Sequence, residues 1–175
     1  MAERTIHIEG TVENIVFKSP RGGYIVLDLD AGGEMVPVVG ELGDIEEGES
    51  LILEGKYETN KKFGTQSRAE YCERKLPSTA VNIEKYLASG AIRGIGPALA
   101  TKIVRVFGAE TLDIIEHQPF RLSEIKGISP KKCEEIAGEA QKLFALRTIM
   151  AFLSQFDVKP MFAMKTFQRF GPDSM

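Results

Sequence analysis

The chain has 175 residues, of which 43% are hydrophobic and 27% are charged, a composition typical of a folded globular protein. This length allows one sizeable hydrophobic core or two small ones. No apolar run approaches the roughly 20 residues of a membrane span, and the charged start MAERTIHIEG has no signal-peptide core. We therefore expect a cytoplasmic protein with no membrane partner.

Charge is unevenly distributed along the chain, although the formal net charge is only -3. Residues 1–55 carry 3 basic and 12 acidic side chains, whereas residues 56–175 carry 19 basic and 13 acidic ones. This asymmetry indicates that only the second part faces a polyanion.

Five segments with period-two alternation, separated by glycine-rich turns, open the chain. They are TIHIEGTVENIVF (5–17), YIVLDLD (24–30), EMVPVVG (34–40), ESLILEGKYET (49–59) and GTQSRAEYCERKL (64–76). Gly10 and Gly55 lie inside strand patterns, where barrels need bulges or sharp bends. The pattern predicts a small five-stranded OB-like β-barrel over residues 1–77, with an SH3-like barrel as the alternative.

At Pro77 the hydrophobic period changes from two to about 3.6, and Ser78 or Thr79 is available as a helix cap. The rest of the chain is predicted to be all-α, in helices of about ten residues. The fold class is therefore α+β and multidomain.

The helical part contains an internal repeat. A shift of 33 residues places IKGISPKKCEEI (125–136) on IRGIGPALATKI (92–103), and a shift of 63 places DVKPMFAMKTFQRFG (157–171) on GIGPALATKIVRVFG (94–108). We predict a tandem two-copy domain over residues 78–147 and a third, degenerate and truncated unit over 148–175.

The first copy has the chemistry of an anion site. Gly94 and Gly96 flank one apolar residue in a turn between helices, where missing side chains let backbone N–H groups approach an anion. The helix that begins near Pro97 directs its positive end at the same place. A phosphate group fits this arrangement.

The stretch GIGPALATKI resembles the helix-hairpin-helix motif of DNA-binding proteins at nearly every defining position. In that family the hairpin binds backbone phosphates without reading bases. The resemblance implies two groups of phosphate-binding residues, namely Arg93, Gly94, Ile95, Gly96, Ala98 and Lys102 in the first copy, and Gly127, Ser129, Lys131 and Lys132 in the second. The third copy replaces both glycines with Asp157 and Lys159, so we interpret it as a packing unit.

A barrel with the EGKYETNKKFGTQ hairpin, followed by tandem hairpins and TLDIIEHQPFRLSEIKGISPKKCEEI, resembles the N-terminal region of the long-form RecD-like ATP-dependent DNA helicases, which are similar to the exodeoxyribonuclease V alpha chain. The resemblance covers essentially the whole chain. It implies a non-sequence-specific DNA-binding accessory region, acting on single strands, junctions or forks in DNA repair or recombination. Its partners would be DNA and C-terminal motor domains that hydrolyse ATP with Mg²⁺ and move 5′-to-3′.

Those motor domains are absent from the 175 residues. GIGPALATK has the lysine of a nucleotide-binding loop but lacks the glycine before it, so no G-x-x-x-x-G-K-[ST] is present. We expect no catalytic residue, metal or cofactor in this chain. Because the third copy ends four residues after Gly171, we also expect a fragment of a longer protein.

The barrel offers few positive groups that could contact a DNA strand. Its possible strand contacts are confined to one hairpin, at Lys61, Lys62, Phe63 and Arg68. The acidic residues elsewhere in the barrel favour docking on the motor or on another protein instead.

Three other functions remain open. A Holliday-junction-binding protein also resembles a barrel followed by two hairpins, and a protein-docking adaptor could carry vestigial hairpins. A helix-hairpin-helix DNA glycosylase would need a catalytic aspartate, for which Asp113 lies at a suitable distance along the sequence, although TLDIIEHQPF is typical of an ordinary amphipathic helix.

Overall fold

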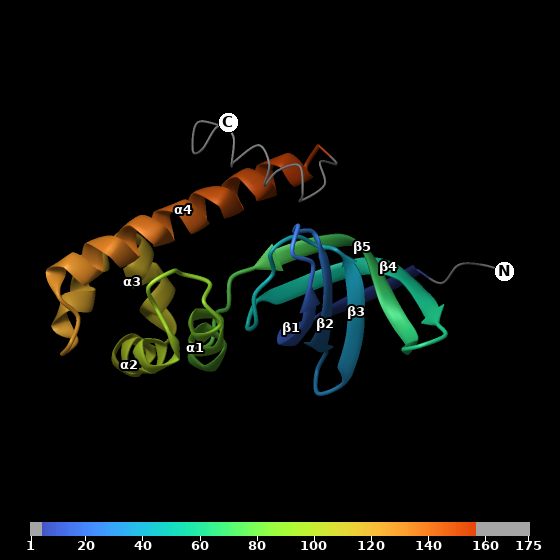
Figure 1. Ribbon diagram of the computed structural model, residues 1–175, viewed down its shortest axis with the longest axis horizontal. Helices are drawn as coiled ribbons and strands as arrows, with labels where there is room; N and C mark the ends of the chain where they lie inside the picture. The colour runs from blue at the N-terminus through green and yellow to red at the C-terminus, as the bar shows by residue number, and fades with distance from the viewer. Residues whose placement is uncertain (1–4, 157–175) are drawn as a thin grey trace. The chain divides into compact units, whose positions relative to one another are not determined.

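The computed structural model describes residues 5–156, which form a β-barrel and a helical unit (Figure 1). The chain divides into compact units between Leu76 and Pro77. The predicted α+β fold class, with a five-stranded barrel followed by an all-α region, is confirmed.

The barrel consists of β1 (Thr5–Lys18), β2 (Tyr24–Asp30), β3 (Met35–Glu41), β4 (Ser50–Asn60) and β5 (Gly64–Lys75). It closes in the order β1-β2-β3-β5-β4, which is an OB-fold topology. The β3–β5 pairing is parallel and joins Val38 to Ser67 and Val39 to Arg68. All other neighbouring strands are antiparallel.

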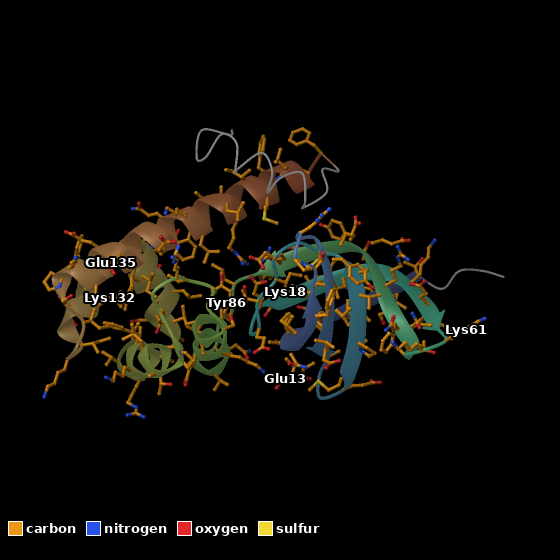
Figure 2. All side chains as sticks on the ribbon, viewed as in Figure 1. Glu13, Lys18, Lys61, Tyr86, Lys132 and Glu135 are labelled. Atoms are coloured by element: carbon orange, nitrogen blue, oxygen red, sulfur yellow. The ribbon has the colours of Figure 1, made fainter. Side chains whose placement is uncertain are left out.

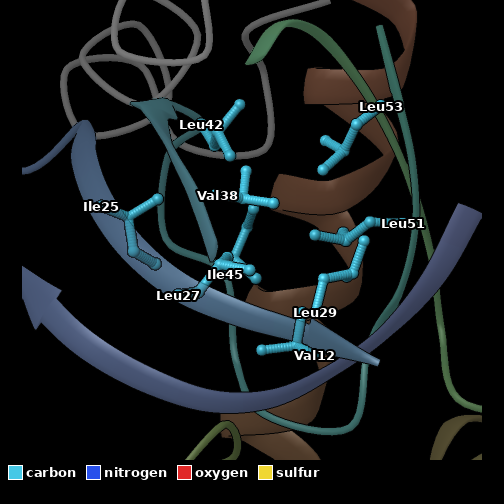
Figure 3. Packing of buried hydrophobic residues seen from close by; sticks show 9 residues of the cluster. All are labelled: Val12, Ile25, Leu27, Leu29, Val38, Leu42, Ile45, Leu51 and Leu53. Carbon is cyan, nitrogen blue, oxygen red and sulfur yellow. The ribbon is translucent and has the colours of Figure 1, made fainter. Parts of the chain in front are cut away.

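Strand alternation produces the barrel core (Figure 3). In β2, for example, Ile25, Leu27 and Leu29 point inward and are fully buried, while the residues between them are partly exposed. The connection from β3 to β4 adds Leu42 and Ile45 to the same cluster. The other members of the cluster are Val12, Val38, Leu51 and Leu53. Burial of these aliphatic side chains is the main stabilising contribution to the barrel.

The two glycines singled out in the strand patterns lie where backbones approach closely. A Cβ on Gly10 would overlap the carbonyl group of Asp30, and one on Gly55 would overlap the carbonyl group of Arg68. The β4–β5 register shifts between Glu54 and Gly55. The bend predicted at Gly55 is therefore confirmed as a bulge.

The helical unit contains α1 (Ala80–Ala88), α2 (Pro97–Phe107), η1 (Gly108–Glu110), α3 (Thr111–His117), η2 (Pro119–Glu124) and α4 (Pro130–Ser154). Thr79 is the cap of α1, because its side chain accepts a hydrogen bond from the Asn82 amide. Fully or nearly fully buried residues from all four α-helices and η2 form the core, among them Ile83, Tyr86, Leu87, Ile103, Ile115, Leu122 and Ile136.

Helix α4 differs from the expected length of about ten residues, since it has 25. Residues 139–154 contain neither glycine nor proline, so nothing in this stretch interrupts the helix. The boundary expected between residues 147 and 148 consequently falls inside α4. Asp157, Lys159 and the remainder of the predicted third unit lie outside the described residues.

Replacing Gly138 with alanine is expected to stabilise α4. Gly138 lies inside this helix, and a Cβ there would meet no atom within 4 Å. Alanine loses less backbone entropy on folding, which raises the free energy of unfolding by about 0.5–1 kcal/mol. Urea unfolding followed by circular dichroism would measure the change. A lower stability would contradict the open surroundings of this position.

Candidate nucleic-acid interface

The two predicted hairpins share one backbone hydrogen-bond pattern. In the first, the Ile95 amide donates to the Ile92 carbonyl at 3.2 Å and the Ala100 amide donates to Gly96 at 2.9 Å. In the second, the equivalent bonds join Ile128 to Ile125 at 3.2 Å and Cys133 to Ser129 at 3.0 Å. Each bond is displaced by 33 residues, so the sequence repeat is also a structural repeat.

Glycine is required at one position of each hairpin. Gly94 has φ 100° and Gly127 has φ 99°, in the left-handed region that L side chains rarely adopt. The next residue of each hairpin, Ile95 or Ile128, is buried and anchors the turn. The tight turns therefore follow from a glycine followed by an apolar anchor.

The two hairpins differ at the N-cap. Ser129 caps α4 because its Oγ accepts a hydrogen bond from the Lys132 amide at 3.1 Å. Gly96 occupies the same position before α2 and offers no side-chain cap. Gly96 has an ordinary extended backbone (φ -92°, ψ -178°), and a Cβ there would meet no atom within 4 Å. The amides at the start of α2 are therefore open to an external acceptor.

The charges around these helix starts also favour an anion. Neither α2 nor α4 has an acidic residue in its first turn, and α4 has Lys131 and Lys132 there. A cation at a helix N-terminus opposes the helix dipole and loses about 0.3–1 kcal/mol of stability. An anion beside these lysines would offset that loss.

The structure places the residues predicted for the first hairpin on one loop and the first two turns of α2. The side chain of Ile95 is buried, whereas Arg93, Gly94, Gly96, Ala98 and Lys102 are exposed. In the second hairpin Gly127, Ser129 and Lys131 are exposed.

Lys132 follows the second hairpin in the sequence, but its side chain lies beside the first hairpin. Its side chain is half-buried, and its Nζ lies 3.4 Å from the position that a Cβ on Gly94 would take. The ammonium group of the second copy is thus beside the turn of the first.

Comparison with known proteins agrees with this geometry. Residues 5–77 match the family model described as "ATP-dependent DNA helicase YrrC, OB-fold domain". Residues 82–144 match the one described as "ATP-dependent RecD2 DNA helicase HHH domain". The chain carries the OB-fold and helix-hairpin-helix domains of the RecD2-type DNA helicases. Their order fits the N-terminal region expected from the sequence.

A curated relative of this family is the ATP-dependent RecD2 DNA helicase of Deinococcus radiodurans. It is 21% identical over 175 residues, an alignment that covers 96% of this chain. The chain spans about a quarter of the length of that relative, of which 24% is covered.

In the OB domain, the predicted strand contacts lie at the end of the β4–β5 hairpin. Lys61 is at the tip (Figure 2), and the Lys62 Nζ lies 5.4 Å from the centroid of the exposed Phe63 ring. Arg68 is engaged in an exposed ion pair with Glu58 at 3.4 Å. Lys61, Lys62 and Phe63 are thus an exposed basic and aromatic tip.

The OB domain also has an exposed aromatic pair that the sequence did not reveal. Phe17 and Tyr24 flank the loop between β1 and β2, with ring centroids 6.5 Å apart, and both are about half exposed. Strand alternation from Ile15 would place Phe17 on the same face as Ile15. A register shift between Ile15 and Phe17 changes that face.

The surroundings of Asp113 in the helical unit do not support the glycosylase alternative. Asp113 is exposed, and its Oδ1 lies 3.1 Å from Nδ1 of His117, one turn further along α3. A small hollow in this domain is lined by Ile115, Glu116, Pro119, Ala137, Gln141 and Phe144, and Asp113 is not among them. This hollow therefore does not place Asp113 in a pocket for a flipped base.

The remaining features bear on thiol reactivity, metal binding and membrane spans in the described part of the chain. Burial raises the pKa of the Cys72 thiol to about 12, so the thiol stays protonated near neutral pH and is a poor nucleophile. Residues 5–156 contain no group of three or more histidine, cysteine or acidic side chains arranged to hold a metal ion. No helix within residues 5–156 is long and apolar enough to cross a membrane.

Proposed function

We propose that this chain is the DNA-binding accessory region of a RecD2-type helicase and that its first hairpin grips a backbone phosphate. The observation that carries the proposal is the open start of α2. There, an uncapped helix N-terminus, an exposed Gly96 and exposed Arg93 and Lys102 lie together. Backbone amides and flanking cations bind phosphate without reading bases.

In this proposal the motor chemistry comes from a larger protein that contains these domains. We propose that motor domains outside this chain bind ATP and Mg²⁺ and move 5′-to-3′ along DNA. The region described would hold DNA during repair or recombination while the motor acts. It would need no cofactor for this role, because a phosphate grip requires only hydrogen-bond donors and positive charge.

The test is fluorescence anisotropy with labelled single-stranded, duplex, forked and four-way-junction DNA across a salt series. Gly96→Val would fill the space that a phosphate needs, while the extended backbone of Gly96 accepts valine. We expect binding to weaken about tenfold or more, equivalent to roughly 1.4 kcal/mol. The salt dependence should also become shallower, because each lost duplex phosphate contact removes about 0.9 from the log–log slope.

Gly138→Val is the matched control. It makes the same substitution at an exposed helical position with no neighbour within 4 Å of the new Cβ, and its affinity should equal that of the wild type. Circular dichroism would verify that all variants are folded. Equal binding by Gly96→Val would place the grip elsewhere. No binding by the wild type at low salt would favour the protein-docking adaptor, and strong preference for the four-way junction would favour the junction-binding alternative.

The OB domain is a second candidate for strand binding. Exposed aromatic rings and lysines near two loops, at Phe17, Tyr24, Lys62 and Phe63, are groups on which unpaired bases stack. Single-strand affinity in the same titration, measured with Phe63→Ala, would separate this contact from the phosphate grip.

A further inference from the structure

The first hairpin has a neighbour that its own sequence does not provide. Lys132 belongs to α4 and its amide bonds to Ser129 of the second hairpin, yet its Nζ lies beside Gly94 of the first. Ile136, one turn further along α4, lies 3.8 Å from the same Cβ position. Helix α4 therefore packs against the first turn and holds the ammonium group there.

This arrangement is not repeated at the second hairpin. The residue equivalent to Lys132 in the first copy is the apolar Leu99, and a Cβ on Gly127 would meet no atom within 4 Å. The two turns have the same backbone, but only the first receives a side chain from the other copy. The repeat is thus symmetric in its backbone hydrogen bonds and asymmetric in charge.

Within residues 5–156 the Lys132 ammonium group forms no ion pair, although Glu135 lies three residues further along α4 (Figure 2). The group lies beside Gly94, in the turn that leads into the positive end of α2, and the exposed Arg93 precedes Gly94 in the chain. An ammonium group near the positive end of a helix is stabilised when an anion lies beside it.

We propose that the first hairpin and Lys132 form one composite site for a phosphodiester group, so that the second copy completes the first instead of binding an equivalent phosphate of its own. This inference rests on the phosphate grip proposed for the first hairpin. It assigns Lys132 to that grip and leaves Lys131 as a matched lysine outside it. A charged donor aimed at the same phosphate as the backbone amides strengthens binding.

The first test compares Lys132→Met with Lys131→Met in the DNA titration. Methionine keeps most of the apolar stem and removes the charge. Lys132→Met should weaken binding about tenfold and Lys131→Met about twofold, while Lys132→Arg should retain affinity. The double variant Gly96→Val/Lys132→Met should bind about as weakly as Gly96→Val alone, because both changes disable one contact. Equal losses at Lys131 and Lys132, or additive losses in the double variant, would overturn the composite site.

The second test uses inorganic phosphate and no DNA. The melting temperature would be measured in phosphate and in chloride at equal ionic strength. Phosphate should stabilise the wild type and Lys131→Met more than it stabilises Lys132→Met or Gly96→Val. A phosphate response that survives in Lys132→Met would contradict the composite site. A response that depends on Lys132 without DNA binding would support the site and reject the proposed DNA function.

Discussion

Replacing Arg74 with methionine is expected to lower the free energy of unfolding of the barrel by about 3–5 kcal/mol. Glu49 is fully buried, with 0% of its side chain exposed against 15% for Arg74. The Arg74 Nη2 donates to both Glu49 carboxylate oxygens, at 2.8 and 3.0 Å, and Nε donates to Oε2 at 3.2 Å. Without the guanidinium group, the buried carboxylate would lose a positive charge and three hydrogen bonds that offset its burial.

Arg74 also connects two parts of the barrel. Its Nη2 donates to the Asp44 carbonyl at 2.8 Å, and the Glu46 amide donates to the Glu49 carboxylate at 3.4 Å. The pair therefore fixes the β3–β4 connection, which carries the core residues Leu42 and Ile45. Loss of Arg74 should loosen this connection and should also remove the positive charge that offsets the burial of Glu49.

Urea unfolding combined with hydrogen exchange of barrel peptides would measure the effect of Arg74→Met. Arg68→Met is the matched control, because its ion pair with Glu58 is exposed and contributes at most about 1 kcal/mol. The double variant Glu49→Leu/Arg74→Met should recover most of the stability, since the charge and its partner are removed together. Equal effects of the two single variants would show that burial of Glu49 is unimportant.

Gly55→Ala is expected to destabilise the barrel by about 3 kcal/mol or more. Its new Cβ would overlap the carbonyl oxygen of Arg68 and lie 2.8 Å from the carbonyl carbon and 2.9 Å from the Ala69 Cα. All three atoms are backbone of the neighbouring strand β5. Because backbone cannot rotate away as a side chain can, β4 and β5 would have to separate at the bulge.

The same urea and hydrogen-exchange measurement would test Gly55→Ala, with Gly138→Ala as the matched control. The two changes add the same methyl group, but their expected effects have opposite sign, because one methyl meets backbone and the other meets no atom within 4 Å. Unchanged barrel stability in Gly55→Ala would contradict the close approach of β4 and β5.

Much of this architecture could be predicted from the sequence, because it depends on local patterns. The five strands begin and end within about one residue of the predicted segments, since alternation and glycine-rich turns mark strand ends directly. The turn of the first hairpin could be predicted equally well, because Gly94 needs a left-handed backbone that few other residues adopt.

Features that depend on packing between distant segments could not be predicted. The sequence assigns Lys132 to the second hairpin, and only the packing of α4 shows its ammonium beside Gly94. Phe17 is exposed because of a bulge that alternation alone does not reveal. The length of α4 was indicated by the lack of glycine and proline after Gly138, but the repeat pattern pointed to a boundary there instead.

The barrel closes along a single short seam, and this has a dynamic consequence. Strands β3 and β5 are joined at Val38–Ser67 and Val39–Arg68, whereas β4 is paired along one edge with β5 from Ser50 to Asn60 and along the other with β1 from Ser50 to Lys56. Local opening requires the least free energy where few backbone bonds and contacts must break. We therefore expect local opening between β3 and β5 while β1, β4 and β5 stay paired.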